Sequence, residues 1–506
     1  MKRVMLRRLL VVLATGLAVA VSAGPASAAD LCVGAGGGCF ATLQAAVNAA
    51  HDGDTIHVGR GTFAGGVTID KSVALVGKGA KASIVSGGGP VLTIFREAGS
   101  AGLSVAISGL TITGGVNDSQ PGAEVTFGGG IWIPTSQLTV PPFNGAGATV
   151  TIDDSVITGN QVMSRSTIPP FVFCGPLPCG FNSGGGIDNG GVLTITDSEI
   201  TNNTSGSTST LGTLASEITA GGITSRFAST LVLRRSVVSG NRAVATLPNG
   251  QFAGVGGVGA SGALTIEDSV VSDNSAEVSG PPVGFEEDLV ALAGGIQVSE
   301  CCGVAPPTAV IRSTKVTGNR AVAHAGSEGT LAVAFGGGLL AEAPLLIERS
   351  EITGNTARAT SFGDAVADGG GMEIDSTVTI RDSLVARNTV VVEAGGAALA
   401  QGGGIANAGQ LTIERTAVVD NHVEASGAGG PLPFGVPSGA LGGGIWNGDF
   451  GGPPPSLNLT NSVVAGNSLE APAGFVRSGG GLYTLYPVSL SKTAIAGNRP
   501  DQCFGC

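Results

Sequence analysis

The sequence has 506 residues, 86 of them Gly, and a formal net charge of −12, with only 12% charged and 4% aromatic residues. An acidic chain without a visible basic patch excludes nucleic acid as a default partner and disfavours anionic lipid or polysaccharide, because these ligands bind clustered Lys and Arg. The few aromatic residues leave little surface on which bases or sugar rings can stack.

The first segment, residues 1–29, has the pattern of a secretory signal. Four basic residues lie within positions 2–8, a mostly apolar stretch runs from Leu9 to Ala23, and Ala26-Ser27-Ala28 supplies a small-residue cleavage site. A membrane anchor is the alternative, but the stretch is shorter than the roughly 20 apolar residues that span a bilayer. We therefore expect cleavage, no membrane span afterwards, and a secreted or extracellular location that includes the cell surface. Removing four basic residues changes the net charge to −16.

Residues 30–115 are the next expected unit, an N-terminal cap followed by the first coils of a repeat structure. Apolar residues within 42–50 recur at helical spacing, and 53–58 indicate a turn followed by a strand. A short amphipathic helix at this place covers a sheet edge that is otherwise exposed. The sequence therefore predicts a capping helix over 42–50.

Residues 116–506 repeat one pattern: a Gly-Gly-hydrophobic tripeptide, a Leu-x-Ile pair, a Ser or Thr, and an Asn. The hydrophobic anchors are Ile131, Ile187, Ile223, Val258, Ile296, Leu339, Met372, Ile405, Ile445 and Leu482. The matching asparagines are Asn160, Asn203, Asn241, Asn274, Asn319, Asn355, Asn388, Asn421, Asn467 and Asn498. A period of about 33 residues or more indicates a stacked solenoid rather than a globular core.

Within each short unit, apolar residues alternate with polar ones, as in Leu193 and Ile195 after Ile187. Alternation with period two predicts strands whose apolar side chains face inward. Several such strands separated by turns make one coil of a parallel β-helix. We therefore predict an all-β fold, a right-handed single-stranded parallel β-helix with a short N-terminal capping helix.

This geometry explains the recurring Asn, Ser and Gly positions. Stacked coils lie about 4.8 Å apart, so equivalent residues become neighbours, and Asn amides can hydrogen-bond along the stack as well as accept a left-handed backbone. Glycines permit positive φ and close backbone approach at a corner. Without a Gly-Lys-Ser/Thr ending, these Gly runs do not predict phosphate binding.

Two charged positions test the register. The residue seven before each Asn alternates in sign over six units: Arg234, Glu267, Arg312, Glu348, Arg381 and Glu414. The residue six before the Asn alternates in the same way over seven units, from Asp197 to Arg415, apart from Ser313. If the coils stack in register, each charge lies beside an opposite one and like charges are kept apart.

Eight cysteines in an exported chain suggest disulfides. They form close pairs in the sequence: Cys32 with Cys39, Cys174 with Cys179, Cys301 with Cys302, and Cys503 with Cys506. Local pairing is one of 105 possible arrangements. A zinc site at the CxxC of Cys503 and Cys506 is the alternative, but no second CxxC or nearby His completes it.

The sequence also resembles known families. Residues 43–77 resemble the N-terminal cap and first coils of secreted pectin-lyase-fold proteins, and the Gly-Gly-Ile and Ile-x-x-Asn repeats are similar to those of polymorphic outer membrane proteins, with Ile or Val in place of Phe. Residues 494–505 resemble the end of many bacterial right-handed β-helix repeat proteins. The resemblance implies a pectin-lyase-like fold and, for the enzymes of that fold, a polysaccharide substrate held near clustered acids or near an Arg with calcium. The Asn-Thr-Asp, Gly-His-Gly and Arg-Ile-Lys motifs of polygalacturonases are absent.

The sequence offers only weak catalytic candidates. Asp153 and Asp154 are adjacent carboxylates, but they occupy the two charge positions, where every unit has a polar residue. None of the four histidines belongs to a recognisable acid/base constellation. We therefore expect no cofactor and no metal site, and no catalytic residue beyond these two candidates.

The residue after each anchor faces outward and forms a row in which a ligand could bind. Its candidates are Trp132, Asp188, Glu373, Trp446 and Tyr483; ordinary solvent-facing strand residues are the alternative. The loop 161–183, with three Phe around Cys174 and Cys179, is a further candidate contact surface or a cover for the adjacent coil.

These observations predict a secreted, monomeric, non-catalytic β-helix protein that acts in adhesion or in binding a polysaccharide or a surface protein. The alternative is a polysaccharide lyase or glycoside hydrolase with an unfamiliar site. The motifs are specific for the fold and weak for function.

Overall fold

The structure is a computed structural model. It describes residues 28–96, 102–118, 127–134, 148–164, 173–174, 177–178, 184–207, 217–218, 220–246, 252–280, 288–300, 308–327, 329–432, 435–449 and 451–506. The predicted signal therefore lies almost entirely outside the described residues, as do Cys179, Cys301 and Cys302, the side chain of Cys174, and most of the loop 161–183.

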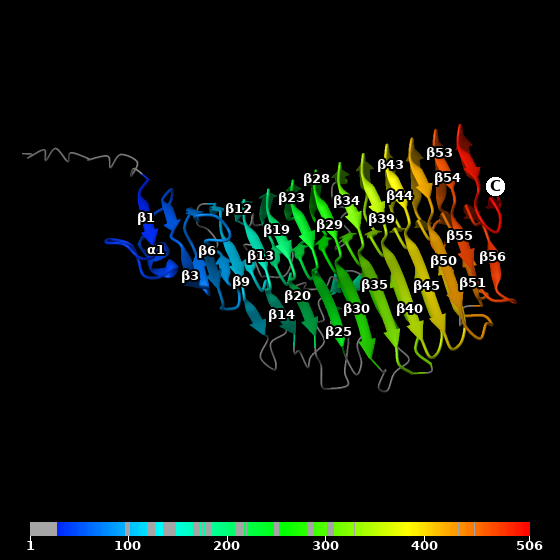
Figure 1. The fold of residues 1–506 in the computed structure, drawn as a ribbon, viewed down its shortest axis with the longest axis horizontal. Coiled ribbons are helices and arrows are strands. Elements are labelled where there is room, and N and C mark those ends of the chain that lie inside the picture. The colour runs from blue at the N-terminus through cyan, green and yellow to red at the C-terminus, as the bar shows by residue number, and fades with distance from the viewer. Residues whose placement is uncertain are drawn as a thin grey trace, which may run out of the picture.

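The strands stack into five parallel sheets that run along one elongated column, confirming the predicted all-β parallel β-helix (Figure 1). A typical coil passes through sheets A, B, D, F and C in that order before it enters sheet A of the next coil. A small antiparallel sheet E pairs β15 (Phe173–Cys174) with β16 (Leu177–Pro178).

Sheets A and B form two neighbouring walls. Sheet A contains β1 (Asp30–Val33), β2 (Thr55–Val58), β5 (Ala74–Val76), β8 (Ser104–Ser108), β12 (Thr149–Asp153), β18 (Val192–Thr196), β23 (Thr230–Arg234), β28 (Ala263–Glu267), β33 (Ala309–Arg312), β38 (Leu345–Glu348), β43 (Thr377–Arg381), β48 (Gln410–Glu414), β53 (Ser456–Thr460) and β58 (Val488–Ser491). Sheet B contains β3 (Gly61–Ala64), β6 (Ser83–Ser86), β9 (Thr111–Thr113), β13 (Val156–Thr158), β19 (Glu199–Thr201), β24 (Val237–Ser239), β29 (Val270–Ser272), β34 (Lys315–Thr317), β39 (Glu351–Thr353), β44 (Leu384–Ala386), β49 (Ala417–Val419), β54 (Val463–Ala465) and β59 (Ala494–Ala496).

Sheets D and F follow the repeat Asn. Sheet D contains β10 (Val116–Asp118), β14 (Gln161–Ser164), β20 (Thr204–Ser207), β25 (Arg242–Thr246), β30 (Ser275–Gly280), β35 (Arg320–Ala325), β40 (Thr356–Ser361), β45 (Thr389–Ala394), β50 (His422–Ser426) and β55 (Ser468–Glu470). Sheet F contains β21 (Glu217–Ile218), β26 (Phe252–Val255), β31 (Leu289–Ala293), β36 (Ala332–Phe335), β41 (Ala365–Asp368), β46 (Ala398–Gln401), β51 (Gly439–Leu441) and β56 (Val476–Ser478).

Sheet C carries the hydrophobic anchors of the repeat. It contains β4 (Val67–Ile69), β7 (Leu92–Ile94), β11 (Ile131–Ile133), β17 (Ile187–Asn189), β22 (Ile223–Ser225), β27 (Val258–Ala260), β32 (Ile296–Val298), β37 (Leu339–Ala341), β42 (Met372–Ile374), β47 (Ile405–Asn407), β52 (Ile445–Asn447), β57 (Leu482–Thr484) and β60 (Cys503–Phe504). Equivalent anchors pair directly, as Met372 does with Ile405.

The predicted capping helix forms as α1 (Leu43–Ala49). Thr42 caps its N-terminus by accepting a hydrogen bond from the Ala45 amide at 3.2 Å. Leu43, Ala46 and Val47 are buried, and the helix packs on β1, β2 and β4. It therefore covers the first coil as the amphipathic pattern predicted.

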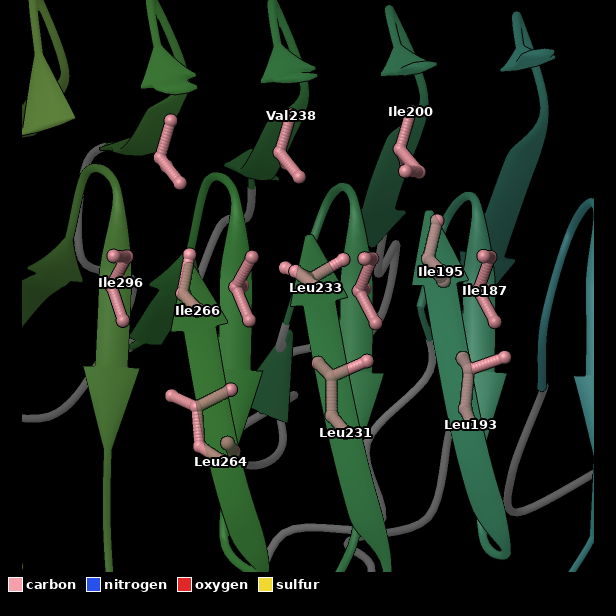
Figure 2. Packing of buried hydrophobic residues seen from close by; sticks show 14 of the residues in the cluster. Ile187, Leu193, Ile195, Ile200, Leu231, Leu233, Val238, Leu264, Ile266 and Ile296 are labelled. Carbon is pink, nitrogen blue, oxygen red and sulfur yellow. The ribbon is translucent and has the colours of Figure 1, made fainter. Parts of the chain in front are cut away.

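From Ala243 onward the coils enclose two cores rather than one. Aliphatic side chains from sheets A, B and C fill the larger core, and Figure 2 shows its rungs, with Ile187, Leu193 and Ile195 repeated one coil later. The second core lies between sheets D and F and consists mainly of alanine, which suits a lobe bounded by only two sheets.

The Gly-Gly backbone of each repeat unit lies against the side chain of the repeat Asn, between the two cores. A Cβ on Gly371 would lie 2.8 Å from Asn388 Nδ2, and a Cβ on Gly370 would lie 2.6 Å from the Thr389 carbonyl oxygen. Such contacts are shorter than packed atoms allow. The glycines are therefore required for close approach, as predicted.

The asparagines form a continuous buried ladder. Asn388 donates from its backbone N and from Nδ2 to Asn421 Oδ1, both at 3.0 Å, and its second Nδ2 hydrogen goes to the Ile352 carbonyl at 2.9 Å. Gln502 Oε1 accepts from Asn498 in the last coil and closes the ladder. The left-handed backbone falls elsewhere than expected: it lies at the second charge position, as at Asp382 with φ 50°, and directly before the Asn, as at Arg387 with φ 54°.

The charge register is confirmed. Glu348 pairs in sheet A with Arg312 on one side and Arg381 on the other. Its carboxylate lies 2.8 Å from Arg312 Nε and 4.0 Å from Arg381 Nη1, and Arg381 also meets Glu414 at 3.2 Å. The alternating signs therefore form a connected ion-pair row.

Two of the expected cysteine pairs are disulfide-bonded. The structure links Cys32 to Cys39 beside the cap, and Cys503 to Cys506 at the other end of the column. The CxxC of the last coil is thus a disulfide here.

Candidate functional site on the outer face of sheet C

The row of residues that follow the anchors is stacked as predicted. Trp132 pairs with Asp188 at one end of sheet C, and Glu373, Ala406, Trp446 and Tyr483 occupy four consecutive rungs at the other. Their side chains point away from the main core because they alternate with the buried anchors. The row therefore lines one outer face of the column.

Most of this row does not face solvent, so the alternative of ordinary solvent-facing strand residues is wrong for most of its members. Asp188 is 0% exposed, and Glu373 and Trp446 are each 2% exposed. Trp132 and Tyr483 are partly buried.

The cause is the turn between sheets F and C. Val366 and Leu399 on the outward face of sheet F pack in one apolar cluster with Ala406 and Trp446 on the outward face of sheet C. The two outward faces thus turn toward each other and bury a third set of side chains outside both cores. Alternation in the sequence separates side chains that face the core from side chains that face outward. It does not show whether the outward faces of two neighbouring strands turn toward each other.

Asp188 is neutralised inside this layer. Arg226 Nε and Nη2 donate to its two carboxylate oxygens at 2.6 and 2.5 Å. The guanidinium lies 4.2 Å from the ring centre of Phe127, which stacks on Trp132 at 5.3 Å. Burial raises the pKa of Asp188 and the Arg226 charge opposes that rise. Asp188 is therefore a carboxylate paired with Arg226, and Trp132 is a ring stacked on Phe127 in the same cluster.

Glu373 has a different environment. It lies beside Asp368 of β41 and near Asp375 and Glu342, and no ion pair reaches any of these four carboxyls from the described residues. Burial raises the pKa of Glu373 and of Asp368 well above the usual range, and the charge of Asp375 raises both further. Glu373 Oε2 and Asp368 Oδ2 are buried without a hydrogen-bond partner among the described residues.

Gln401 connects this acidic group to the aromatic row. With its amide oriented by its partners, Gln401 Nε2 donates to Asp368 Oδ1 at 3.0 Å and Gln401 Oε1 accepts from the Trp446 indole at 2.9 Å. At the outer edge, Gln297 Nε2 donates to Glu342 Oε2 at 2.8 Å. One oxygen of Asp368 is therefore fixed and the other is left to a further donor.

The sequence analysis singled out Glu373 and Trp446 but missed Asp368 and Gln401. The signal was present, because both residues end an Ala-x-Ala-x segment directly before a Gly run in consecutive units. What the sequence did not supply was the direction in which those side chains point relative to sheet C.

The catalytic candidates Asp153 and Asp154 lie apart from this site. Asp153 ends β12 in sheet A, and Asp154 follows it with φ 45°. Both are exposed, and neither has a hydrogen bond to a His, Glu or second Asp in the described part of the chain. They fit the charge positions of the repeat.

Tyr483 lies at the far end of the row. Its ring stacks on Phe504 of the last strand with centroids 4.8 Å apart, and Phe504 is 46% exposed. This pair is the accessible aromatic surface of the row's C-terminal end.

Within the described residues, no group of three or more His, Cys, Asp or Glu side chains is arranged to hold a metal ion. The same residues contain no helix with the length and apolar character needed to cross a membrane.

Comparisons with known proteins give distant matches in structure only. No protein-family model and no curated protein matches the sequence. The mannuronan C-5 epimerase AlgE6 A-module of Azotobacter vinelandii matches with a TM-score of 0.39 and 15% identity over 89% of this chain and 94% of that one. The AlgE4 A-module from the same organism matches with a TM-score of 0.34 and 14% identity over 91% and 94%. Similarity at this level supports no inference about activity.

Proposed function

We propose that this chain is an exported, non-catalytic binding protein, a rigid column that presents connecting loops to a glycan or to a protein at the cell surface. The supporting observation is where the units differ in length. The connection from sheet D to sheet F spans 362–364 in one coil and 427–438 in another, and that from sheet C to sheet A spans 375–376 and 448–455.

The other corners of the repeat change little: the corner from sheet F to sheet C has two residues at 256–257 and three at 369–371, and the turns from sheet A to sheet B and from sheet B to sheet D have two. The turns from sheet A to sheet B and from sheet B to sheet D hold the Ser or Thr ladder and the Asn ladder, whose hydrogen bonds pass from coil to coil. A change in the length of those corners leaves buried polar groups without hydrogen-bond partners, which lowers the free energy of unfolding by about 1–3 kcal/mol for each group. Large differences in length therefore occur at two corners of the repeat, and variable loops on a fixed scaffold suit recognition.

A loop exchange tests this proposal. Replacing 427–438 by the short connection 395–397 keeps the coil and removes one long loop. On arrays of glycans and of surface proteins, we expect the wild-type chain to bind a ligand, and the exchange to reduce that binding with little change in melting temperature. Exchanging the short connection 362–364 for 395–397 is the matched control, since both are the same length.

A second candidate function is supported by the acidic group at Glu373. A polysaccharide lyase or glycoside hydrolase needs carboxyls with separated or raised pKa values, and Asp368 and Glu373 have raised ones. Incubation with pectate and other polysaccharides, followed by assay of new reducing ends or unsaturated products, tests it. Turnover that is lost in Glu373→Gln, or in Asp153→Asn or Asp154→Asn, would replace the non-catalytic proposal. Binding without turnover supports the non-catalytic proposal.

A further inference from the structure

Buried carboxylates on the outer face of sheet C occur in two places, and only one has its counter-charge. Asp188 and Glu373 are equivalent residues of different units, each directly after its anchor. Arg226 lies one coil beyond Asp188, where its backbone N donates to the Asn189 carbonyl at 2.9 Å. The corresponding residue one coil beyond Glu373 is Ala408, whose backbone N donates to the Ile374 carbonyl at 2.8 Å.

Ala408 ends at its Cβ, so nothing in that position reaches Glu373 as Arg226 reaches Asp188. Neighbouring rungs add negative charge, because Glu342 and Asp375 occupy the same column as Ala408. Among the described residues, four carboxyls therefore share one region without a cationic partner.

The orphaned oxygens identify what is missing. Glu373 is 2% exposed and its Oε2 has no hydrogen-bond partner among the described residues, and Asp368 is 0% exposed with Oδ1 bonded and Oδ2 without a partner there. A buried carboxylate without a donor is costly and is normally paired. When both acids are ionised, a hydrogen-bond donor with positive charge satisfies both oxygens and offsets their charge.

We propose that the group formed by Glu342, Asp368, Glu373 and Asp375 binds an organic cation, an ammonium or guanidinium group carried by a ligand. The chain itself neutralises the equivalent carboxylate with a guanidinium, which sets the chemical precedent. A metal ion fits less well, since no three of these side chains are arranged to converge on one point. A guanidinium or ammonium group presents several N–H donors and can serve separate carboxyls.

Asp375 is the exposed member of the group, whereas Glu373 and Asp368 are buried, so we infer that the ligand approaches from the side of Asp375. In the free protein, protons on the buried pair take the place of the ligand, and a bound cation displaces them. Affinity for the cation therefore increases as pH rises through the raised pKa values of the pair.

Calorimetric titration at several pH values tests the proposal. The probes are N-acetyl-arginine amide, an oligomer of glucosamine, the neutral N-acetylated oligomer, and calcium chloride. We expect one of the two organic cations to bind, more tightly as the pH is raised, and the neutral oligomer not to bind. Binding of the arginine derivative indicates a basic protein side chain as the natural source, and binding of the amino sugar indicates a glycan.

Glu373→Gln keeps the size of the side chain and removes the charge, and we expect it to weaken binding at least about tenfold, which corresponds to about 1.4 kcal/mol. Glu424→Gln changes an exposed acid on β50 and serves as the matched control, with unchanged binding. Ala408→Arg supplies an internal guanidinium and should abolish binding of both cations. Circular dichroism melting verifies that each variant is folded.

Three results overturn the proposal: no organic cation binds at any pH, calcium alone binds and is lost in Glu373→Gln, or Glu424→Gln weakens binding as much as Glu373→Gln. This inference rests on the proposed binding role and names the ligand chemistry of one site. The proposed function and the cation site can fail separately. The arrays test whether the loops bind a ligand, and the titration tests whether the acidic group binds a small cation, so a negative result in one does not determine the other.

Discussion

Asp188 and Glu373 occupy equivalent places on the same sheet, and they differ in what compensates the buried charge. Asp188 has a bidentate guanidinium that stacks on an aromatic ring, whereas Glu373 has three further acids in its group and Ala408 in place of the arginine. Both carboxyls are buried because they occupy the same position in the repeat. Whether the buried charge is compensated depends on a single residue in the next coil, which is Arg226 for Asp188 and Ala408 for Glu373.

The largest expected effect comes from removing the counter-charge of Asp188. Arg226→Met leaves a fully buried carboxylate without its partner, which costs about 3–5 kcal/mol in the free energy of unfolding. Urea denaturation of the wild type and variant measures the difference.

The matched control is Asp188→Asn in the Arg226→Met background, which removes the stranded charge and should restore part of the loss. A loss of less than about 1 kcal/mol in Arg226→Met would show that the pair contributes no more than an exposed ion pair.

The reverse change at the other site should stabilise the protein. Ala408→Arg places a guanidinium beside Glu373, and a charge-assisted hydrogen bond contributes about 1.5–3 kcal/mol, less the side-chain entropy lost. We expect a higher melting temperature at neutral pH. Ala408→Met adds similar bulk without charge, and equal stabilisation by both variants would assign the gain to packing.

The pH dependence of stability separates the two carboxylates further. In the folded protein, burial raises the pKa of Glu373 above its ordinary value of 4.5 and the pKa of Asp368 above its ordinary value of 3.8. Their contribution is therefore fully present below those values and is lost as pH rises through the folded-state pKa.

Glu373→Gln stays neutral at every pH, so its free energy of unfolding should exceed that of the wild type at alkaline pH and approach it near pH 4.5. Denaturation at several pH values gives the two curves. The difference amounts to about 1.36 kcal/mol for each unit by which the pKa is raised. Parallel curves would mean that Glu373 ionises as readily folded as unfolded.

The smallest change in stability is expected for the exposed ion-pair row. Its ion pairs are screened by solvent, so the row is the reference against which the two buried carboxylates are compared. Arg381→Glu places three acids in succession with Glu348 and Glu414, and each exposed contact contributes well under about 1 kcal/mol. Thermal unfolding should show a small decrease that salt reduces. Unchanged unfolding in low salt would count against any energetic role of the register.

The fold was predictable because each ladder repeats its own residue type. The anchors such as Met372, the asparagines such as Asn388 and the alternation of Arg381 with Glu414 all depend on neighbours one period away in the sequence. The site was predictable only in part, since Glu373 and Trp446 belong to a repeat position, whereas Asp368 and Gln401 reach them through the turn between sheets F and C. That turn depends on how two strands of one coil are oriented, which no period in the sequence records.

The alternating ion-pair row has a consequence for how such a column grows. The Asn ladder and the Ser or Thr ladder present the same hydrogen-bonding groups in successive units, so they accept an added unit at any point in the repeat. The Arg and Glu row has a period of two coils, so a single duplicated unit would bring two like charges together, whereas a duplicated pair would not. Between Arg234 and Glu414, units added in pairs therefore preserve the alternation, and the electrostatic repeat is twice as long as the structural one.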